Sequence, residues 1–420
     1  MSEPLVLERA EHQVSRKHVD ANAIKVLYRL HKSGYKGYLV GGSVRDLMLG
    51  RRPKDFDVGT DARPNDIRRL FRNARIIGRR FRLAHIIFHD GVVEVATFRR
   101  TPDPNDQRGG PEELLITSDN TFGSPRQDAF RRDFTINAMF YNIADFTVID
   151  YVGGIDDLDD RLIRVIGDPD VRFCEDPVRM LRACEFAGRL GFTIEADTQE
   201  GIQRQRETLL KAAPPRLTEE ILQLLKSGNA GASFQWMLEL GIVEVLIPEA
   251  LAMVRAAELE IGTFDNVLPV LDAMAQDGRE LPDAVLLSAL LLPEVLVERF
   301  KREQKRRRWL SAAEVRDLAS ETLERFCERF AVPNLKKALI VQGLEGFHRL
   351  CEGNFTRSQR IRFASKSYFD HALLLFEILV QATGEGHEAF EEWQVAASQR
   401  RRRDPPVEVR RPRRRRRRRR

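Results

Sequence analysis

Residues 38–60 read YLVGGSVRDLMLGRRPKDFDVGT and join a glycine turn to two closely spaced aspartates. The apolar run before Gly41-Gly42 predicts a strand, and the residues after it predict a helix with Ser43 as its N-cap. Such a turn presents backbone N–H groups and the positive end of a helix dipole at one place. We therefore predict a phosphate site at this turn, with Arg45 adding a positive charge one turn into the helix.

The two aspartates that follow, Asp55 and Asp57, are separated by one apolar residue. On a strand, both carboxylates lie on one face, about 7 Å apart at the usual rise per residue. Two carboxylates this close resist joint ionisation unless a cation lies between them. The pair therefore predicts a divalent-cation site, where Mg²⁺ would suit a hydroxyl nucleophile and a pyrophosphate leaving group. Two surface aspartates in a turn are the alternative.

A third carboxylate often completes such a metal site, and the sequence offers two candidates. Glu94 lies in the predicted strand VVEVATF, the second strand of a hairpin with Asp90-Gly91 in its turn. Asp133 lies in RRDFTINAM. We rank Asp133 above Glu94, because Glu94 also fits an ordinary strand charge facing a cleft.

The composition limits the class of protein. A chain of 420 residues favours two or three domains over one core. No apolar run approaches the ~20 residues of a membrane helix, and the charged N-terminus does not resemble a signal peptide. The four cysteines have neither disulfide-framework nor metal-ligand spacing. We predict a cytoplasmic protein without a membrane span.

Changes in pattern divide the chain into five parts. We expect a flexible lead-in at 1–20, an α+β head at 21–165, a helical neck at 166–228, a helical body at 229–399 and a basic tail at 400–420. The tail holds fourteen arginines and two acidic residues and so has a net charge of +12. Because the whole chain has a net charge of +6, the first 399 residues have a net charge of −6. Such a tail cannot bury apolar surface, and we expect it to be disordered and to bind a polyanion. A solvated solubility tail is the alternative.

Four motifs occur in a fixed order along the chain: YLVGGSVRDLMLG, KDFDVGT, RRDFTINAM and CEDPVRMLRA. Their order and spacing resemble the nucleotidyltransferase branch that contains bacterial CCA-adding enzymes and bacterial poly(A) polymerases. The resemblance covers about residues 35–225. It implies a polymerase-beta-like head, a small mixed sheet with helices, followed by an all-α neck and body.

The resemblance also implies roles for residues in these motifs. Asp55 and Asp57 would be the catalytic, Mg²⁺-binding pair, and Asp133 a further essential carboxylate. Arg132 would contact the triphosphate or ribose of the ATP substrate, and Asn137 would support the same pocket.

The motif EDPVRMLR at 175–182 corresponds to the base-selecting element of this family. Asp176 before Pro177 predicts an N-cap with proline at the first helical position, and Arg179 and Arg182 share one helix face. A carboxylate can accept from an adenine amino group, and a guanidinium can donate to a ring nitrogen. We predict that Asp176, Arg179 and Arg182 bind the nucleotide; a cap and a solvated arginine are the alternative.

One position departs from the family pattern. Glu185 stands where relatives commonly have a further arginine, and Arg189 one turn later is a possible replacement. This difference concerns how tightly phosphates or primer are held.

The motifs alone do not separate poly(A) polymerases from CCA-adding enzymes. The hairpin with GRRFRLAHIIF, the stretch DNTFGSPRQDAFRRDFTINAM and the basic tail resemble the poly(A) polymerase group more closely. We therefore predict a monomeric polynucleotide adenylyltransferase that extends RNA 3′ ends with AMP from ATP and releases pyrophosphate by a two-metal mechanism. A CCA-adding enzyme and an inactive RNA-binding relative are the alternatives.

Overall fold

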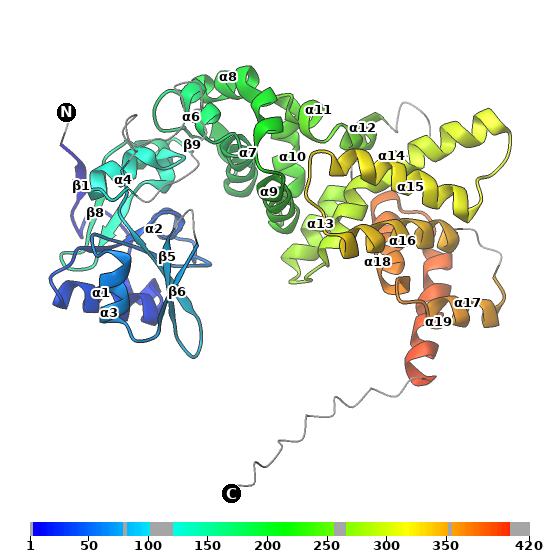
Figure 1. The fold of residues 1–420 in the computed structure, drawn as a ribbon, viewed down its shortest axis with the longest axis horizontal. Helices are drawn as coiled ribbons and strands as arrows, with labels where there is room; N and C mark the ends of the chain where they lie inside the picture. Colours follow the sequence, from blue (N-terminus) through cyan, green and yellow to red (C-terminus); the bar gives the residue numbers. More distant parts are fainter. Residues whose placement is uncertain (1–2, 79–81, 101–120, 256–265, 352–354, 404–420) are drawn as a thin grey trace, which may run out of the picture. The chain divides into compact units, whose positions relative to one another are not determined.

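The computed structural model describes residues 3–78, 82–100, 121–255, 266–351 and 355–403 (Figure 1). The chain forms two compact units, Met1–Ile221 with Gly231–Leu246, and Leu222–Ala230 with Ile247–Arg420. The predicted boundary between head and neck at 165 lies inside the first unit, and the predicted boundary at 228 lies in the segment where the chain passes between the units. The basic tail from 404 onward lies outside the described residues.

The head is built on one mixed sheet of eight strands in the order β1-β8-β7-β2-β3-β6-β5-β4. β3 pairs antiparallel with β2 and parallel with β6, so it lies in the middle of the sheet. The predicted α+β fold class is confirmed. The elements of the head are β1 (Leu5–Leu7), η1 (Arg16–His18), α1 (Ala21–Lys32), β2 (Gly37–Val40), α2 (Gly42–Met48), β3 (Asp57–Thr60), α3 (Pro64–Leu70), β4 (Ala74–Ile77), β5 (Leu83–Ile87), β6 (Val92–Thr97), α4 (Pro125–Arg131), η3 (Thr135–Asn137), β7 (Phe140–Asn142), β8 (Thr147–Asp150) and α5 (Gly154–Asp159).

The predicted first helix forms because its apolar residues recur every three or four positions. Val26, Leu27 and Leu30 are fully buried, and α1 packs against β2, β3 and β6. Asp20 caps the helix by accepting hydrogen bonds from the N–H groups of Asn22 and Ala23 at 2.8 and 3.0 Å. α1 therefore covers one face of the sheet and fixes the central strands.

The expected loose lead-in at 1–20 differs from the structure. Leu5–Leu7 form an edge strand that pairs antiparallel with β8, and Val14 is fully buried. His12 Nε2 lies 2.8 Å from the carbonyl oxygen of Phe146. The sheet edge offers unpaired backbone groups that a short segment can satisfy, and three residues are too few to show a strand period.

The remaining elements of the first unit are mostly helical, as predicted for the neck. The exception is β10, which pairs parallel with β9 over two residues and lies in the predicted helical neck; such a short strand carries no period. The elements are β9 (Leu162–Ile163), α6 (Pro169–Glu175), α7 (Arg179–Leu190), β10 (Thr193–Ile194), α8 (Ala196–Gln205), η4 (Arg206–Lys211), α9 (Pro214–Lys226), α10 (Ala230–Glu239) and α11 (Ile242–Leu246).

The second unit is helical throughout its described part, and α14 packs against α15, α16 and α18. Residues 284–293 of α14 are buried on all sides, so this segment forms the middle of the core. The elements are η5 (Pro248–Leu251), α12 (Ala252–Arg255), α13 (Val267–Gln276), α14 (Asp283–Arg306), α15 (Ala312–Cys327), α16 (Asn334–Cys351), α17 (Arg357–Ala364), α18 (Phe369–Thr383) and α19 (His387–Arg403). α19 extends four residues beyond the predicted end of the body at 399.

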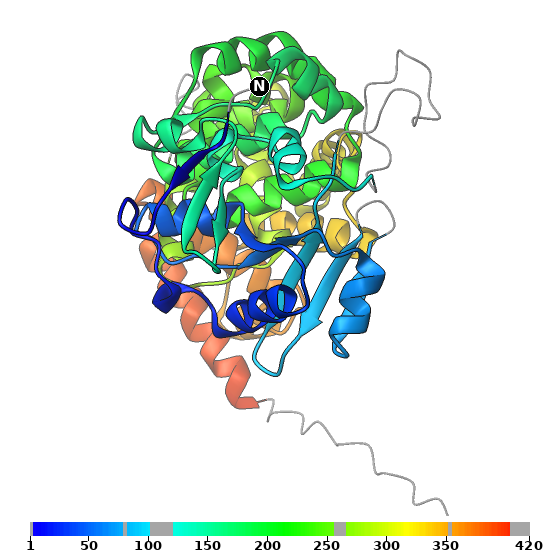
Figure 2. The same cartoon turned by 90° about the vertical axis from the view of Figure 1, so that its left-hand side faces the viewer.

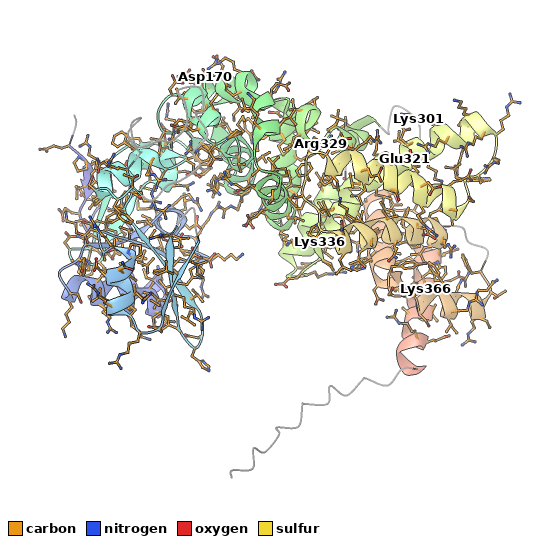
Figure 3. The ribbon with its side chains drawn as sticks, viewed as in Figure 1. Asp170, Lys301, Glu321, Arg329, Lys336 and Lys366 are labelled. Carbon is orange, nitrogen blue, oxygen red and sulfur yellow. The ribbon has the colours of Figure 1, made fainter. Side chains whose placement is uncertain are left out.

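Ion pairs join the helices of the second unit, and Figure 3 labels Glu321 and Lys336, one residue from each of two such pairs. Arg302 of α14 contacts Glu321 of α15 at 2.6 Å, and Lys336 of α16 contacts Asp283 of α14. These pairs are partly exposed, so each contributes little, about 1 kcal/mol or less. In the described part of the chain, no helix combines the length and the apolar character needed to cross a membrane.

Candidate active site

Asp57 begins the central strand β3, and Asp55 lies two residues before it, outside the strand. The prediction that one strand carries both aspartates was therefore correct only for Asp57. The register that places Val58 opposite Val95 brings Asp57 beside Glu94 of β6. The three residues Asp55, Asp57 and Glu94 are called the acidic edge below.

The neighbouring carboxylates of the acidic edge disfavour the ionisation of Asp57. Asp57 keeps solvent access, yet protein atoms surround its carboxylate closely enough to desolvate it. This desolvation, followed by the charges of Glu94 and Asp55, raises the pKa of Asp57 to about 6, although Arg132 opposes the shift. A bound cation would relieve this repulsion, so these oxygen ligands fit a divalent ion such as Mg²⁺. Among the described residues, however, no three acidic, histidine or cysteine side chains are arranged as a complete metal site.

Glu94 and Asp133, the two candidates for a third carboxylate, have different surroundings. Glu94 is the charged neighbour that raises the pKa of Asp57 most, and it also lies 3.1 Å from His85 Nε2. Asp133 accepts two hydrogen bonds from Arg182, at 2.7 and 3.0 Å. This placement reverses the predicted ranking, because Glu94, and not Asp133, adjoins the carboxylate that begins β3.

Asp133 is fully occupied by protein donors. Besides Arg182, it accepts hydrogen bonds from the N–H group of Phe134 at 2.8 Å and from the side chain of Asn137 at 3.2 Å. Burial alone would raise the pKa of Asp133, but Arg182 and these donors outweigh it and lower the pKa to about 2. Asp133 is thus placed to hold Arg182 and Asn137 in position, and the geometry does not favour it as a metal ligand.

The glycine turn adjoins Arg132. Gly41, not Ser43, is the N-cap of α2, with a φ of 71° that favours glycine. The Ser43 hydroxyl instead donates to the Val40 carbonyl at 3.0 Å. A Cβ atom on Gly41 would lie 3.2 Å from Arg132 Nη1, so the turn and this guanidinium are immediate neighbours.

Arg132 is held at the turn by a residue that the sequence analysis missed. Asp128 accepts from Arg132 Nε and Nη2 at 3.1 and 2.9 Å, and Arg132 Nη1 donates to the Asn137 carbonyl at 3.2 Å. The signal was present, because an aspartate four residues before an arginine on one helix face is a favourable pair. Arg132 therefore lies beside the glycine turn, and its role as a phosphate ligand stays a prediction.

We expect Gly41→Ala to raise, about tenfold, the KM for the phosphate-bearing substrate that the sequence predicts at this turn. An alanine at this φ is strained by about 1 to 2 kcal/mol, and its Cβ would displace Arg132. Gly34→Ala is the matched control, because Gly34 has a φ of 84° and its Cβ would meet nothing within 4 Å. Steady-state kinetics and thermal unfolding of both variants separate the two effects. If Gly34→Ala raises the KM equally, backbone strain and not the phosphate site is responsible.

Arg45 is buried, with 2% of its surface exposed, although the sequence placed it in contact with phosphate. Its guanidinium contacts Asp46 at 2.8 Å and donates to Asn137 Oδ1 at 2.5 Å. The side-chain oxygen of Asn137 thus accepts a hydrogen bond from Arg45, and its side-chain nitrogen donates one to Asp133. The structure makes Arg45 and Asn137 positioning residues for the glycine turn and Arg132.

A group of arginines surrounds Arg131. Burial, together with the charges of Arg99, Arg132, Arg172 and Arg179, lowers the pKa of Arg131 to about 9. Like charges gathered in a partly desolvated place attract an anion, because an anion offsets both desolvation and repulsion. Arg132 joins this arginine group to the glycine turn, and Asp128 and Glu175 offset part of its charge by pairing with Arg132, Arg172 and Arg179.

The base-selecting motif differs from its prediction. Asp176 is the C-cap of α6, and Val178 is the N-cap of α7, so Asp176 is not the predicted N-cap. Its carboxylate pairs with Arg216 of α9 at 2.7 and 3.1 Å. Arg179 is buried and donates to the Arg172 carbonyl at 2.8 Å and to Glu175 at 3.4 Å. The sequence could not indicate Arg216, because it lies 40 residues away from Asp176.

Glu185 is paired within its own helix. It contacts Arg189 at 2.9 Å, and burial raises its pKa against the lowering effect of Arg189, Arg182 and Arg45. The guanidinium groups of these three arginines also lie 5.1–5.2 Å from the centre of the Phe186 ring. The carboxylate of Glu185 therefore offsets part of the positive charge of Arg45, Arg182 and Arg189.

These features define a class of protein. A central strand that begins with an aspartate, beside a glycine turn and an arginine group, is the arrangement of a nucleotidyltransferase head. The Poly A polymerase head domain matches residues 37–164, and the family described as "Probable RNA and SrmB- binding site of polymerase A" matches residues 191–253.

Among similar proteins, Poly(A) polymerase I of Haemophilus influenzae is 38% identical over 345 residues, which cover 80% of this chain and 75% of that protein. This chain belongs to the poly(A) polymerase family. Poly(A) polymerase I of Salmonella typhi is 50% identical over 252 residues, 58% of this chain. The match covers 53% of that relative, so this chain spans about half of its length.

Nucleotidyltransferases of the polymerase-beta type generally need a divalent metal.

A solved structure shows the same fold. The CCA-adding enzyme of Bacillus stearothermophilus in complex with CTP aligns with 90% of this chain and 82% of its own, with a TM-score of 0.60 and 22% sequence identity.

Proposed function

We propose that this protein is a polynucleotide adenylyltransferase that transfers AMP from ATP to RNA 3′ ends without a template. The observation that carries the proposal is the acidic edge on β3 and β6, together with Arg132 and the glycine turn. Membership of the poly(A) polymerase family supports the choice of reaction. The proposal includes the predicted site residues, Mg²⁺ as the metal, and ATP and RNA as the substrates.

In the proposed reaction, the RNA 3′-hydroxyl oxygen attacks the α-phosphorus of ATP, and the bond to pyrophosphate breaks. A divalent cation on Asp55 and Asp57, Mg²⁺ in our proposal, would lower the pKa of the hydroxyl and offset phosphate charge. The backbone N–H groups at Gly41 and Gly42, together with Arg132, would bind the triphosphate. The neighbouring arginine group would stabilise the charge that develops on pyrophosphate.

Arg132 can only act if its guanidinium is fixed before the substrate binds. Asp128 and the Asn137 carbonyl hold it, and Asn137 is in turn held by Arg45 and Asp133. Arg182 completes this chain of contacts through Asp133. Arg45, Asp133 and Arg182 thus support the nucleotide site indirectly in our proposal.

For base selection we propose the Asp176–Arg216 pair. Both side chains are partly exposed, at 24% and 35%, whereas Arg179 retains 8% and is occupied by Glu175 and a carbonyl. The carboxylate would accept from the adenine amino group, and the guanidinium would donate to a ring nitrogen. This replaces the predicted Asp176–Arg179 combination.

Primer extension with Mg²⁺ tests the proposal. An unstructured RNA and a tRNA lacking its 3′ end are each supplied with ATP or CTP alone. Long A-tails on both RNAs, with little incorporation of CTP, are expected. Extension of the tRNA only, with CTP needed before one A, would show a CCA-adding enzyme. RNA binding without any incorporation would point to an inactive relative.

A further inference from the structure

A cavity of 860 Å³ adjoins the acidic edge on the head. Three separate segments form its wall: residues 17–22 of the lead-in and α1, residues 50–56 before β3, and residues 90–93 at the tip of the β5–β6 hairpin. Figure 2 shows α1 beside this tip, where Asn22 donates to Asp90 at 2.9 Å. The hydrogen bond fixes two of the three walls against each other.

The cavity is rich in positive charge. Lys17, Arg52 and Lys54 are exposed in its wall and have no acidic partner within the described residues. Arg51 also lines it, and within the described residues its guanidinium makes only long contacts, at 3.4 and 3.5 Å, with backbone carbonyl oxygens. The basic residues that precede the aspartates in RRPKDFD therefore gather at one place, which suits a chain of phosphates.

The acidic groups in the wall are fewer and mostly engaged. Asp20 caps α1, and Asp90 binds Asn22, so both carboxylates already accept hydrogen bonds from the protein. The remaining acidic group is Asp55 of the acidic edge. Phe56 adds an aromatic ring to the wall, and such rings stack on nucleobases irrespective of sequence.

The position of Asp55 distinguishes the ligand from ATP. The proposed triphosphate ligands Gly41, Gly42 and Arg132 do not line this cavity, whereas Asp55 does. The cavity thus reaches the reacting centre without sharing the residues of the triphosphate site. A second phosphate-bearing substrate is the chemistry that these walls fit.

We propose that this cavity receives the 3′-terminal nucleotides of the RNA primer, with Lys17 and Arg52 contacting its phosphates and Phe56 contacting a base. The inference rests on the proposed function, in which the 3′ end of the primer must reach the cation on Asp55 and Asp57. The proposal places the binding site for the 3′ end of the RNA primer on the head. It also gives the lead-in a part in binding that primer.

The test compares two double variants of the full chain. Lys17→Ala/Arg52→Ala removes two cations from the cavity wall. Lys32→Ala/Arg75→Ala removes the same two charges from exposed positions of the head outside the cavity, where neither residue has an acidic partner in the described part of the chain. Lys54 is left intact because it adjoins Asp55.

The first readout is steady-state kinetics with hexaadenylate as primer. We expect the cavity variant to raise the KM for primer about tenfold and to leave the KM for ATP unchanged. A rise in the KM for ATP instead would show that the cavity holds the triphosphate. Equal effects of both double variants would show that only net charge matters. Either result overturns the proposal.

The second readout is independent of catalysis. Fluorescence anisotropy of labelled hexaadenylate, measured in a metal chelator at several salt concentrations, reports binding alone. Loss of two phosphate contacts lowers the slope of log affinity against log salt by about 1.4 for a single strand. An unchanged slope overturns the cavity assignment even if the enzyme is active. Absence of AMP incorporation by the unaltered chain, with this slope change present, overturns the proposed function alone.

Discussion

Asp57→Asn abolishes AMP transfer, with an expected loss of at least about a thousandfold, and at the same time raises the thermal stability of the metal-free protein. The loss follows because Asp57 is the carboxylate at the start of β3 on which the proposed cation site depends. The gain follows because this carboxylate is desolvated and faces Glu94 and Asp55. The Asp57→Asn variant therefore separates the proposed catalytic role of this carboxylate from its cost to the stability of the metal-free protein.

The pH dependence of this stability gain has a definite sign. The pKa of Asp57 is raised from 3.8 to about 6, so the folded state binds its proton more tightly than the unfolded state. The stabilising effect of that proton is complete below about pH 4 and is lost as the pH rises through 6. Asp57→Asn should therefore match the unaltered protein at pH 4 and exceed it above pH 6. The full shift would be about 3 kcal/mol, but solvent access screens it to about 1 kcal/mol, or about 2 to 4 °C in Tm.

Thermal unfolding in chelator and in excess Mg²⁺, at pH 4 and pH 7.5, measures this prediction. Mg²⁺ should stabilise the unaltered protein at pH 7.5 and have little effect on Asp57→Asn. Asp159→Asn is the control, since it removes an exposed carboxylate of the head that has no partner in the described part of the chain. A lower Tm for Asp57→Asn at pH 7.5 in chelator, or near-normal turnover, would contradict the assignment.

Arg182→Ala should give the largest loss of stability in the first unit. It leaves Asp133, whose side chain is only 14% exposed, without the ion pair that keeps its pKa near 2. Breaking a buried pair costs about 3 to 5 kcal/mol, and the 37% exposure of Arg182 reduces this to about 2 to 3 kcal/mol. We expect the Tm to fall by about 5 to 10 °C. The KM for ATP should also rise, because Asp133 holds Asn137 beside Arg132.

Two further variants show whether the burial of Asp133 is the cause. Arg204→Ala breaks the exposed pair with Asp170, the residue labelled in Figure 3; the side chains are 50% and 39% exposed, so the Tm should change little. Asp133→Asn/Arg182→Met removes the uncompensated charge and should regain part of the Tm lost in Arg182→Ala. If Arg182→Ala is no less stable than Arg204→Ala, then Asp133 is not held as described.

The parts of the head that the sequence predicted are those with local signals. The strand, glycine turn and helix at 37–48 follow from an apolar run and two glycines, and the hairpin with Asp90-Gly91 follows from its turn residues. The first helix follows from its apolar period. In each case the decisive residues lie within one or two turns of each other, so propensity and pattern were enough.

The parts that could not be predicted depend on contacts between distant residues. The Asp176–Arg216 pair spans 40 residues, and the Asp133–Arg182 pair spans 49. The burial of Arg45 follows from packing against Asn137, 92 residues away. The family resemblance named residues that do meet in this region, but it did not indicate which of them contact each other.

The N-terminal edge strand has a practical consequence for work with this protein. Leu5–Leu7 are bound to β8 at one end of the lead-in, and Asp20 caps α1 at the other, so residues 17–20 are tethered on both sides. Deleting the first ten residues, or fusing a bulky tag that displaces β1, would release one tether. By our proposal, such a preparation would keep Asp55 and Asp57 and still bind short RNA poorly. An unmodified N-terminus is therefore the sound starting point for any kinetic comparison.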